Sequence, residues 1–229
     1  MNAKRCVAAF TGLALLSGCA TPESGWTPLF DGHSLSGWKE SGFGGAGKVE
    51  VVDGRLLLGQ GSPMTGVTWV GGAERGVAGD FPRDDYELEL DAARLLGTDF
   101  FCGLTFPVGD THLTLVLGGW GGSLCGLSCL DGNDAANNET KSFHSFERGR
   151  SYHVRLLVAA GRVQAWLDGA PLVDVETRGR FLSLPPEVEP CRPLGIASYS
   201  TQAAITNIRW RRTSAPAGGA AVDRAPHRP

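Results

Sequence analysis

The sequence predicts an all-β domain, and three observations lead to that prediction. Apolar and polar residues alternate in short runs, glycine, aspartate and proline separate these runs, and no segment between residues 25 and 212 sustains the 3.6-residue repeat of a helix. Glycine accounts for 33 of the 229 residues, about twice its usual share. Apolar residues make up 42% of the chain and charged residues 20%, which is enough apolar side chain for a packed core.

The alternating runs predict thirteen strands. Short strands at this spacing, separated by turn residues, are typical of a β-sandwich or a barrel. The strands are expected at residues 48–52, 55–58, 67–70, 85–95, 100–107, 111–117, 124–130, 141–147, 151–158, 162–167, 172–175, 195–199 and 204–211.

Alternation also assigns the faces of individual strands. In residues 86–91 the apolar side chains share one face, and the carboxylates Glu87, Glu89 and Asp91 share the other. Residues 151–158 and 162–167 alternate in the same way, and the tight connection at 159–161 predicts an antiparallel hairpin between them. Trp166 and Trp210 alternate away from their apolar neighbours and should face outward.

The N-terminus has the pattern of an export signal. Lys4 and Arg5 precede an apolar run at residues 7–16, which is too short to span a membrane. The sequence Leu-Ser-Gly-Cys at residues 16–19 resembles the lipobox of bacterial lipoproteins, in which the cysteine is acylated and becomes the first mature residue. We therefore expect a signal peptide at 1–18, a lipidated linker at 19–24 that begins with Cys19, and a location on the periplasmic face of the outer membrane or at the cell surface.

The composition of the C-terminus limits the extent of the domain, and the net charge limits the kinds of partner that it can bind. Residues 213–229 are rich in alanine, proline and glycine, so we expect a disordered tail after a domain at 25–212. The formal charge is −3, and it becomes −5 once the leader with its two basic residues is removed. An acidic chain of this kind argues against a nucleic-acid partner.

Four cysteines remain inside the domain, namely Cys102, Cys125, Cys129 and Cys191. In an oxidising compartment they could form two disulfides in any of three pairings, or they could be buried free thiols. A zinc site is disfavoured, because no second close pair follows Cys125 and Cys129.

The opening residues carry a family resemblance. The segment GWTPLFDGHSLSGW at 25–38 closely resembles the start of the 3-keto-disaccharide hydrolase domain family, and the resemblance continues in RVQAWLDG at 162–169 and PLGIAS at 193–198. It implies a concanavalin-like jelly-roll β-sandwich of two antiparallel sheets, one of them concave and usually the ligand face. It also implies a carbohydrate substrate, a glycoside already oxidised to a ketone at C3 of the sugar.

Such a ketone acidifies the hydrogen on C2, so a base can remove that proton while the glycosidic oxygen leaves. The site then needs a general base, a proton donor for the leaving group, and a metal or fixed donors for the enolate oxygen.

The polar segment at residues 131–141 is the richest source of such groups. We predict Glu139 and Asp131 as catalytic carboxylates, with Asn138 and Lys141 as substrate-binding partners. Two alternatives stay open: a solvated turn in which aspartate and asparagine cap their own backbone, and a divalent metal site, calcium for example, built on the oxygens of Asp131, Asn133 and Asn137.

Three further features complete the candidate site. His112 lies opposite the apolar face of its strand and is our third catalytic candidate. Glu87 and Glu89 would bind substrate on a concave face but would be ordinary surface charges on a convex one. Trp120 stands between two pairs of glycines, a setting suited either to an exposed platform for a sugar ring or to a tight bend.

Two functions from different classes follow. The first is a lipid-anchored envelope hydrolase or lyase acting on 3-keto-glycosides, which requires two acid/base groups around one sugar ring. The alternative is a non-catalytic carbohydrate-binding or structural envelope module, which needs aromatic and amide contacts alone.

Overall fold

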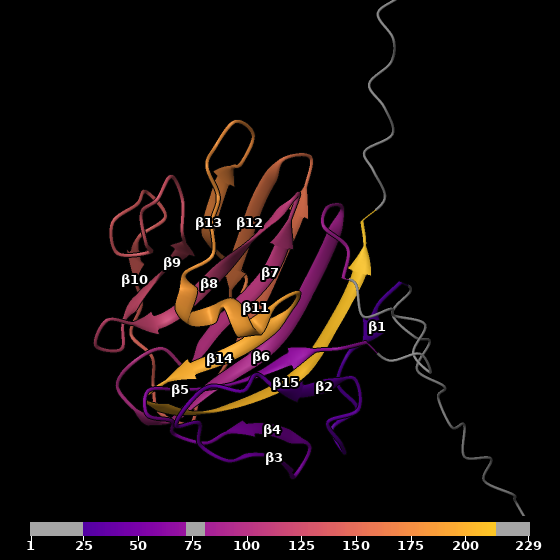
Figure 1. Cartoon of the computed structure of the whole chain (residues 1–229), viewed down its shortest axis with the longest axis vertical. Helices are drawn as coiled ribbons and strands as arrows, with labels where there is room; N and C mark the ends of the chain where they lie inside the picture. Colours follow the sequence, from indigo (N-terminus) through magenta and orange to yellow (C-terminus); the bar gives the residue numbers. More distant parts are fainter. Residues whose placement is uncertain (1–24, 72–80, 214–229) are drawn as a thin grey trace, which may run out of the picture.

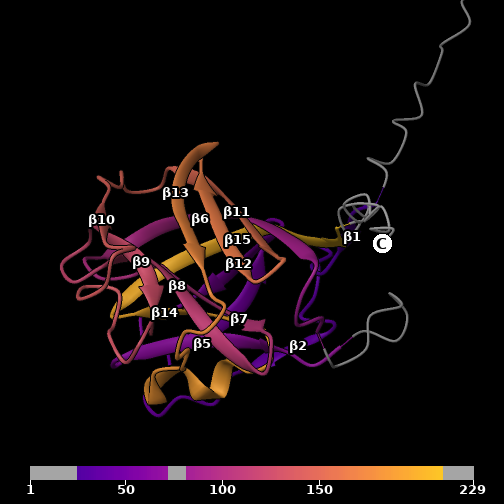
Figure 2. The same ribbon diagram turned by 90° about the horizontal axis from the view of Figure 1, so that it is seen from above.

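The computed structural model describes residues 25–71 and 81–213, which form two antiparallel sheets packed face to face (Figure 1, Figure 2). Strands of the first sheet run in the order β13-β12-β11-β6-β15-β4-β3, with β1 paired to β15. Those of the second sheet run β10-β9-β8-β7-β14-β5-β2. The expected jelly-roll β-sandwich is therefore confirmed.

The strands of the first sheet are β1 (Thr27–Pro28), β3 (Val49–Val52), β4 (Arg55–Leu58), β6 (Tyr86–Gly97), β11 (Ser151–Ala159), β12 (Arg162–Leu167), β13 (Ala170–Glu176) and β15 (Thr201–Arg212). Those of the second are β2 (Trp38–Glu40), β5 (Met64–Trp69), β7 (Cys102–Val108), β8 (Thr111–Gly119), β9 (Leu124–Ser128), β10 (Ser142–Phe143) and β14 (Gly195–Tyr199). The 3-10 helix η2 (Pro186–Cys191) lies against β5 and β14, on the side away from the first sheet (Figure 2).

The main core fills the space between the sheets. Alternate side chains of β6, β11 and β12 point into it, as the sequence predicts, and they meet the apolar faces of β7, β8 and β14. Tyr86 is fully buried there, and its hydroxyl donates to the carbonyl of Pro107 at 2.7 Å. This bond joins β6 of one sheet to β7 of the other and satisfies a polar group that would otherwise be costly to bury.

A second apolar layer covers the outer face of the second sheet. Met64, Ala197, Val188 and Cys191 form a buried cluster there, with Phe43 and Phe100 packed against it. Two glycines of the sheet make room for these rings. A Cβ atom on Gly66 would lie 2.9 Å from the ring of Phe43, and one on Gly103 would lie 3.0 Å from that of Phe100. The glycines of this sheet therefore allow the loops with Phe43 and Phe100 to pack closely against its outer face.

The four cysteines of the domain are unpaired, so the disulfide alternative is wrong for them. Cys102 and Cys125 both belong to the core, but they lie on β7 and β9 with β8 between them. Two strand spacings amount to about 9.6 Å, which exceeds the Cα separation that a disulfide can bridge.

Cys19 and the rest of the expected leader fall outside the described residues, as does nearly all of the expected tail. Within 25–71 and 81–213, no helix has the length and apolarity needed to cross a bilayer.

Candidate functional site

A pocket of about 440 Å³ opens on the outer face of the second sheet. Its floor is formed by β8 and β9, and its sides come from two connecting segments, the loop at 131–141 and a strap at 180–193 that includes η2. We call it the aromatic pocket. Its lining residues are Met64, Phe100, Thr114, Val116, Trp120, Ser128, Cys129, Asp134, Pro185, Pro186, Glu187, Val188 and Tyr199.

Trp120 is the exposed aromatic platform of this pocket. Its side chain is 51% exposed, and its backbone has a φ of +46°, a left-handed conformation that is unfavourable for a bulky residue. The flanking glycines and one external bond hold this conformation: Gly122 donates to the carbonyl of Gly119, and Arg94 Nη1 donates to the carbonyl of Gly122 at 3.0 Å. Trp120 is therefore exposed at this turn and not packed inward.

Two carboxylates line the aromatic pocket from different segments. Asp134 comes from the loop 131–141, and its Oδ1 accepts hydrogen bonds from the backbone of Ala136 at 3.0 Å and from Nδ2 of Asn137 at 2.7 Å. Glu187 comes from the first turn of η2. The pocket thus has two carboxylates that come from separate segments, and hydrogen bonds orient the one on Asp134.

The floor of the pocket supplies hydroxyl groups. Thr114 Oγ1 lies 2.9 Å from Oγ1 of Thr105 on the neighbouring strand, and Ser128 Oγ lies 3.3 Å from Sγ of Cys129. Hydroxyls fixed in this way can donate to an oxygen that gains negative charge.

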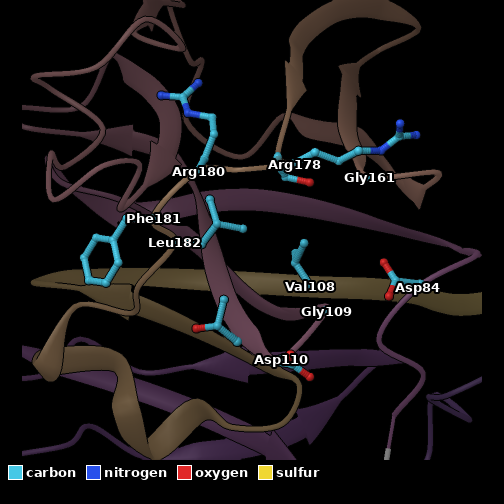
Figure 3. Close-up of a pocket in the computed structure, with 11 residues that line it drawn as sticks. Asp84, Val108, Gly109, Asp110, Gly161, Arg178, Arg180, Phe181 and Leu182 are labelled. Atoms are coloured by element: carbon cyan, nitrogen blue, oxygen red, sulfur yellow. The ribbon is translucent and has the colours of Figure 1, made fainter.

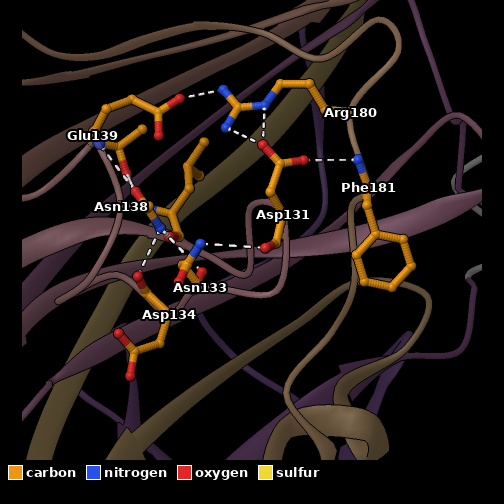
Figure 4. A network of polar contacts seen from close by, with 9 residues as sticks. Asp131, Asn133, Asp134, Asn138, Glu139, Arg180 and Phe181 are labelled. Atoms are coloured by element: carbon orange, nitrogen blue, oxygen red, sulfur yellow. Dashed lines mark hydrogen bonds and ion pairs between the residues drawn. The ribbon is translucent and has the colours of Figure 1, made fainter.

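Asp131 and Glu139 lie close together because Arg180 binds both of them (Figure 4). Neither of the two lines the aromatic pocket. Nε and Nη2 of Arg180 reach Oδ2 of Asp131 at 2.9 and 2.6 Å, and the backbone of Phe181 donates to Oδ1 at 2.9 Å. Hydrogen bonds from the guanidinium lower the pKa of both carboxyls. This cluster, which we call the clasp, connects the loop 131–141 to the strap.

A second cavity, of about 360 Å³, lies on another side of the strap (Figure 3). It is lined by charged side chains, among them Asp84, Asp110, Arg178 and Arg180. Burial and the neighbouring Asp85 and Asp110 raise the pKa of Asp84. Arg180 is committed to the clasp and Arg178 donates to the carbonyl of Ala160, so the two arginines have partners within the chain.

Asn138 shapes the loop rather than lining the aromatic pocket. Its Nδ2 donates to the backbone carbonyls of Leu127, Asn133 and Asp134, and its Oδ1 accepts from Thr140 (Figure 4). Lys141 is exposed at the end of the same loop.

Of the groups considered for calcium, the two asparagine side chains are hydrogen-bond donors, and the carboxylate of Asp131 accepts hydrogen bonds from Arg180. The side-chain amides of Asn133 and Asn137 donate to the carbonyl of Asp131 and to the carboxylate of Asp134. Within the described residues, no group of three histidine, cysteine or acidic side chains is arranged to hold a metal ion.

His112 faces the outer side of its sheet, as expected, but it is 5% exposed and does not line the aromatic pocket. Neither ring nitrogen has a hydrogen-bond partner in the described structure. Burial, reinforced by the positive charges of Arg192 and Arg83, lowers the pKa of His112 to about 4.

Glu87 and Glu89 lie on the outer face of the first sheet, whereas the aromatic pocket lies on the outer face of the second sheet. Both are buried, and each is held by arginine: Glu87 by Arg155 and Arg211, and Glu89 by Arg209. They form a ladder of ion pairs across β11, β6 and β15.

Several pocket residues were not among the sequence candidates, namely Phe100, Asp134, Glu187 and Tyr199. Asp134 lies within the polar loop 131–141, so its position shortly after the strand could have identified it as a candidate site residue. The other three belong to segments that only the fold brings to this face.

The comparisons with known proteins agree with the fold and identify the family. The sequence profile of the 3-keto-alpha-glucoside-1,2-lyase-like domain matches residues 25–211. The chain belongs to this family. The expected resemblance is therefore confirmed, and membership of the 3-keto-alpha-glucoside-1,2-lyase-like family supports a carbohydrate-active function. No curated protein matches the chain in sequence.

Solved structures share the fold of this lyase-like domain at low identity. A candidate glycosyl hydrolase from Parabacteroides distasonis is 16% identical, with a TM-score of 0.52 over 83% of this chain and 94% of its own. The Crh5 transglycosylase in complex with NAG is 11% identical, with a TM-score of 0.55 over 84% and 86%. An alginate lyase from Corynebacterium sp. is 11% identical, with a TM-score of 0.51 over 83% and 100%.

Proposed function

We propose that this protein cleaves glycosides that carry a ketone at C3 of the sugar, and that the reaction takes place in the aromatic pocket. The observation that carries the proposal is the presence of two carboxylates from separate segments, Asp134 and Glu187, in one pocket with an exposed tryptophan. Family membership supplies the type of substrate.

The sugar ring stacks on Trp120, and the carboxylate of Asp134 removes the proton from C2. Electrons from the C2–H bond form the enolate, whose oxygen at C3 accepts hydrogen bonds from the floor hydroxyls of Thr114 and Ser128. The bond from C1 to the glycosidic oxygen then breaks, and Glu187 serves as the proton donor to the leaving oxygen. This elimination produces a C1–C2 double bond conjugated to the ketone, and addition of water returns a hydroxyl to C1 and a proton to C2.

The test uses 3-keto-trehalose and 3-keto-lactose, with and without divalent ions, and follows release of free sugar. General acid–base groups contribute about 100-fold or more, so Asp134→Asn and Glu187→Gln should each reduce kcat by at least that factor. Asp53→Asn is the matched control, because this exposed aspartate lies in the β3–β4 turn of the first sheet, away from the aromatic pocket. Saturable sugar binding without release in the wild type would replace catalysis by the binding-module alternative.

We further propose that the domain acts at the cell envelope through a lipid on Cys19. The basic start, the short apolar run and the Leu-Ser-Gly-Cys sequence support this location. In bacteria expressing the full chain, the protein should sediment with membranes and incorporate labelled palmitate. Cys19→Ser should remove the label, and a labelled Cys19→Ser protein would reject the proposed anchor.

A further inference from the structure

A second depression adjoins the aromatic pocket and shares its aromatic wall. It has a volume of about 240 Å³ and is lined by Asp99, Phe100, Trp120 and Tyr199. All but Asp99 also line the aromatic pocket. The rings of Phe100 and Tyr199 are packed together, with centroids 5.7 Å apart. One group of aromatic side chains therefore borders two neighbouring hollows.

Asp99 is the charged group of the second depression, and its position is fixed. Its Oδ1 accepts a hydrogen bond from the backbone of Phe100 at 2.7 Å. Its backbone N–H donates to Oγ1 of Thr201, and its carbonyl accepts from the same hydroxyl, both at 3.1 Å. In the described part of the chain, no hydrogen bond or ion pair to Oδ2 is found, so this oxygen can accept hydrogen bonds from a ligand.

We propose that the second depression is the subsite for the leaving portion of the glycoside, and that Asp99 selects a leaving group with several hydroxyls, a sugar or a sugar alcohol. The inference rests on the proposed function. A glycoside extends to both sides of its glycosidic oxygen, so cleavage in the aromatic pocket requires space for the leaving portion next to it. A carboxylate oxygen that accepts from hydroxyls favours a polyol, whereas an aryl group would desolvate the carboxylate without replacing its hydrogen bonds.

The experiment compares two substrates that share the oxidised sugar and differ in the leaving portion: 3-keto-trehalose, which releases glucose, and 4-nitrophenyl 3-keto-α-glucoside, which releases a phenol. Asp99→Asn keeps an oxygen for the N–H of Phe100 but replaces the free oxygen by a donor. We expect its kcat/KM to fall about tenfold or more for 3-keto-trehalose and to stay at or above the wild-type value for the aryl substrate. Equal falls for the two substrates, or no fall for 3-keto-trehalose, would overturn the proposal.

Two further variants serve as a second test and as a control. Asp99→Ser can still accept from Phe100 and should show the same selectivity, which keeps the test decisive if Asp99→Asn does not fold. Asp53→Asn changes an exposed aspartate in the β3–β4 turn and should leave both substrates unaffected.

Failure of the proposed function has a separate signature, since the wild type would then cleave neither substrate. In that case calorimetric titration with trehalose and with methyl α-glucoside tests the subsite directly. Tighter binding of trehalose that is lost in Asp99→Asn supports the subsite. Equal binding of the two sugars by the wild type rejects it.

Discussion

Arg180 and Asp131 are joined by two hydrogen bonds to a single carboxylate oxygen, from Nε at 2.9 Å and from Nη2 at 2.6 Å. The same guanidinium also binds Glu139. The two residues thus connect the strap to the loop 131–141, and these segments are the sides of the aromatic pocket. The carboxylates that the sequence suggested as catalytic are therefore placed to position the pocket.

Removal of the clasp should change stability in a pH-dependent way. Arg180 lowers the pKa of Asp131 and Glu139, so the ion pairs stabilise the fold above the ordinary carboxyl pKa of about 4 and lose this effect as the pH falls through the lowered values. We expect Arg180→Met to melt modestly below wild type at pH 7, with the gap closing in more acidic buffer. Scanning calorimetry from pH 7 to pH 2.5 measures the gap, and one that widens on acidification contradicts this assignment.

His112 should make the fold less stable in mild acid. Its pKa is lowered to about 4 in the folded protein, against about 6.5 in an unfolded chain, so between these values the unfolded state binds more protons. Stability should therefore fall as the pH drops from 6.5 towards 4. Urea midpoints measured across this range should depend less on pH in His112→Leu than in the wild type. Parallel curves would show that another group is responsible.

Trp120 should illustrate a conflict between stability and binding. Its left-handed backbone costs about 1 kcal/mol or more for a residue other than glycine, and glycine adopts that conformation freely. Trp120→Gly should accordingly melt at or above the wild-type temperature while losing most sugar affinity in calorimetric titrations. Trp120→Phe, which keeps a ring, should retain part of that affinity. A glycine variant that binds as well as wild type would remove Trp120 from the site.

Cys129 should be the reactive thiol among the cysteines of the described domain. Burial raises the pKa of Cys102 and Cys191 to about 12 and that of Cys125 to about 11, whereas Cys129 is partly exposed and lines the aromatic pocket. Treatment with iodoacetamide at pH 8, followed by peptide mass mapping, should modify Cys129 first. A bound sugar should slow that modification, and equal labelling of Cys191 would contradict the described burial.

The fold could be predicted closely from the sequence where strands alternate over four residues or more. The bounds expected at 55–58, 162–167 and 195–199 are those of β4, β12 and β14. The short strands β1 and β2 were missed, because two or three residues carry no periodic signal. The run expected at 141–147 contributes only the two-residue β10.

Trp210 shows why alternation fails at a bulge. The register of β15 against β6 shifts between Thr206 and Arg209, next to Asn207 with its φ of +54°. The shift turns Trp210 onto the core instead of outward.

The site was harder to predict than the fold, because long-range contacts assemble it. The glycines around Trp120 made an exposed side chain one of two alternatives from local sequence alone. Glu187 and Tyr199, however, reach the pocket from segments more than 60 residues later in the chain. His112 shows the same dependence on long-range contacts. The sequence predicted which face of its strand it occupies, but its burial depends on the structure packed over that face.

The central claim, elimination from C2 in the aromatic pocket, is tested most directly by running the reaction in D₂O. Addition of heavy water across the C1–C2 double bond places deuterium on C2 of the released keto-sugar, and mass spectrometry at early times can detect it. The account predicts one deuterium per cleavage event in the product, above the exchange seen in enzyme-free substrate, and loss of both cleavage and labelling in Asp134→Asn. Wild-type product released without deuterium at C2 would contradict it.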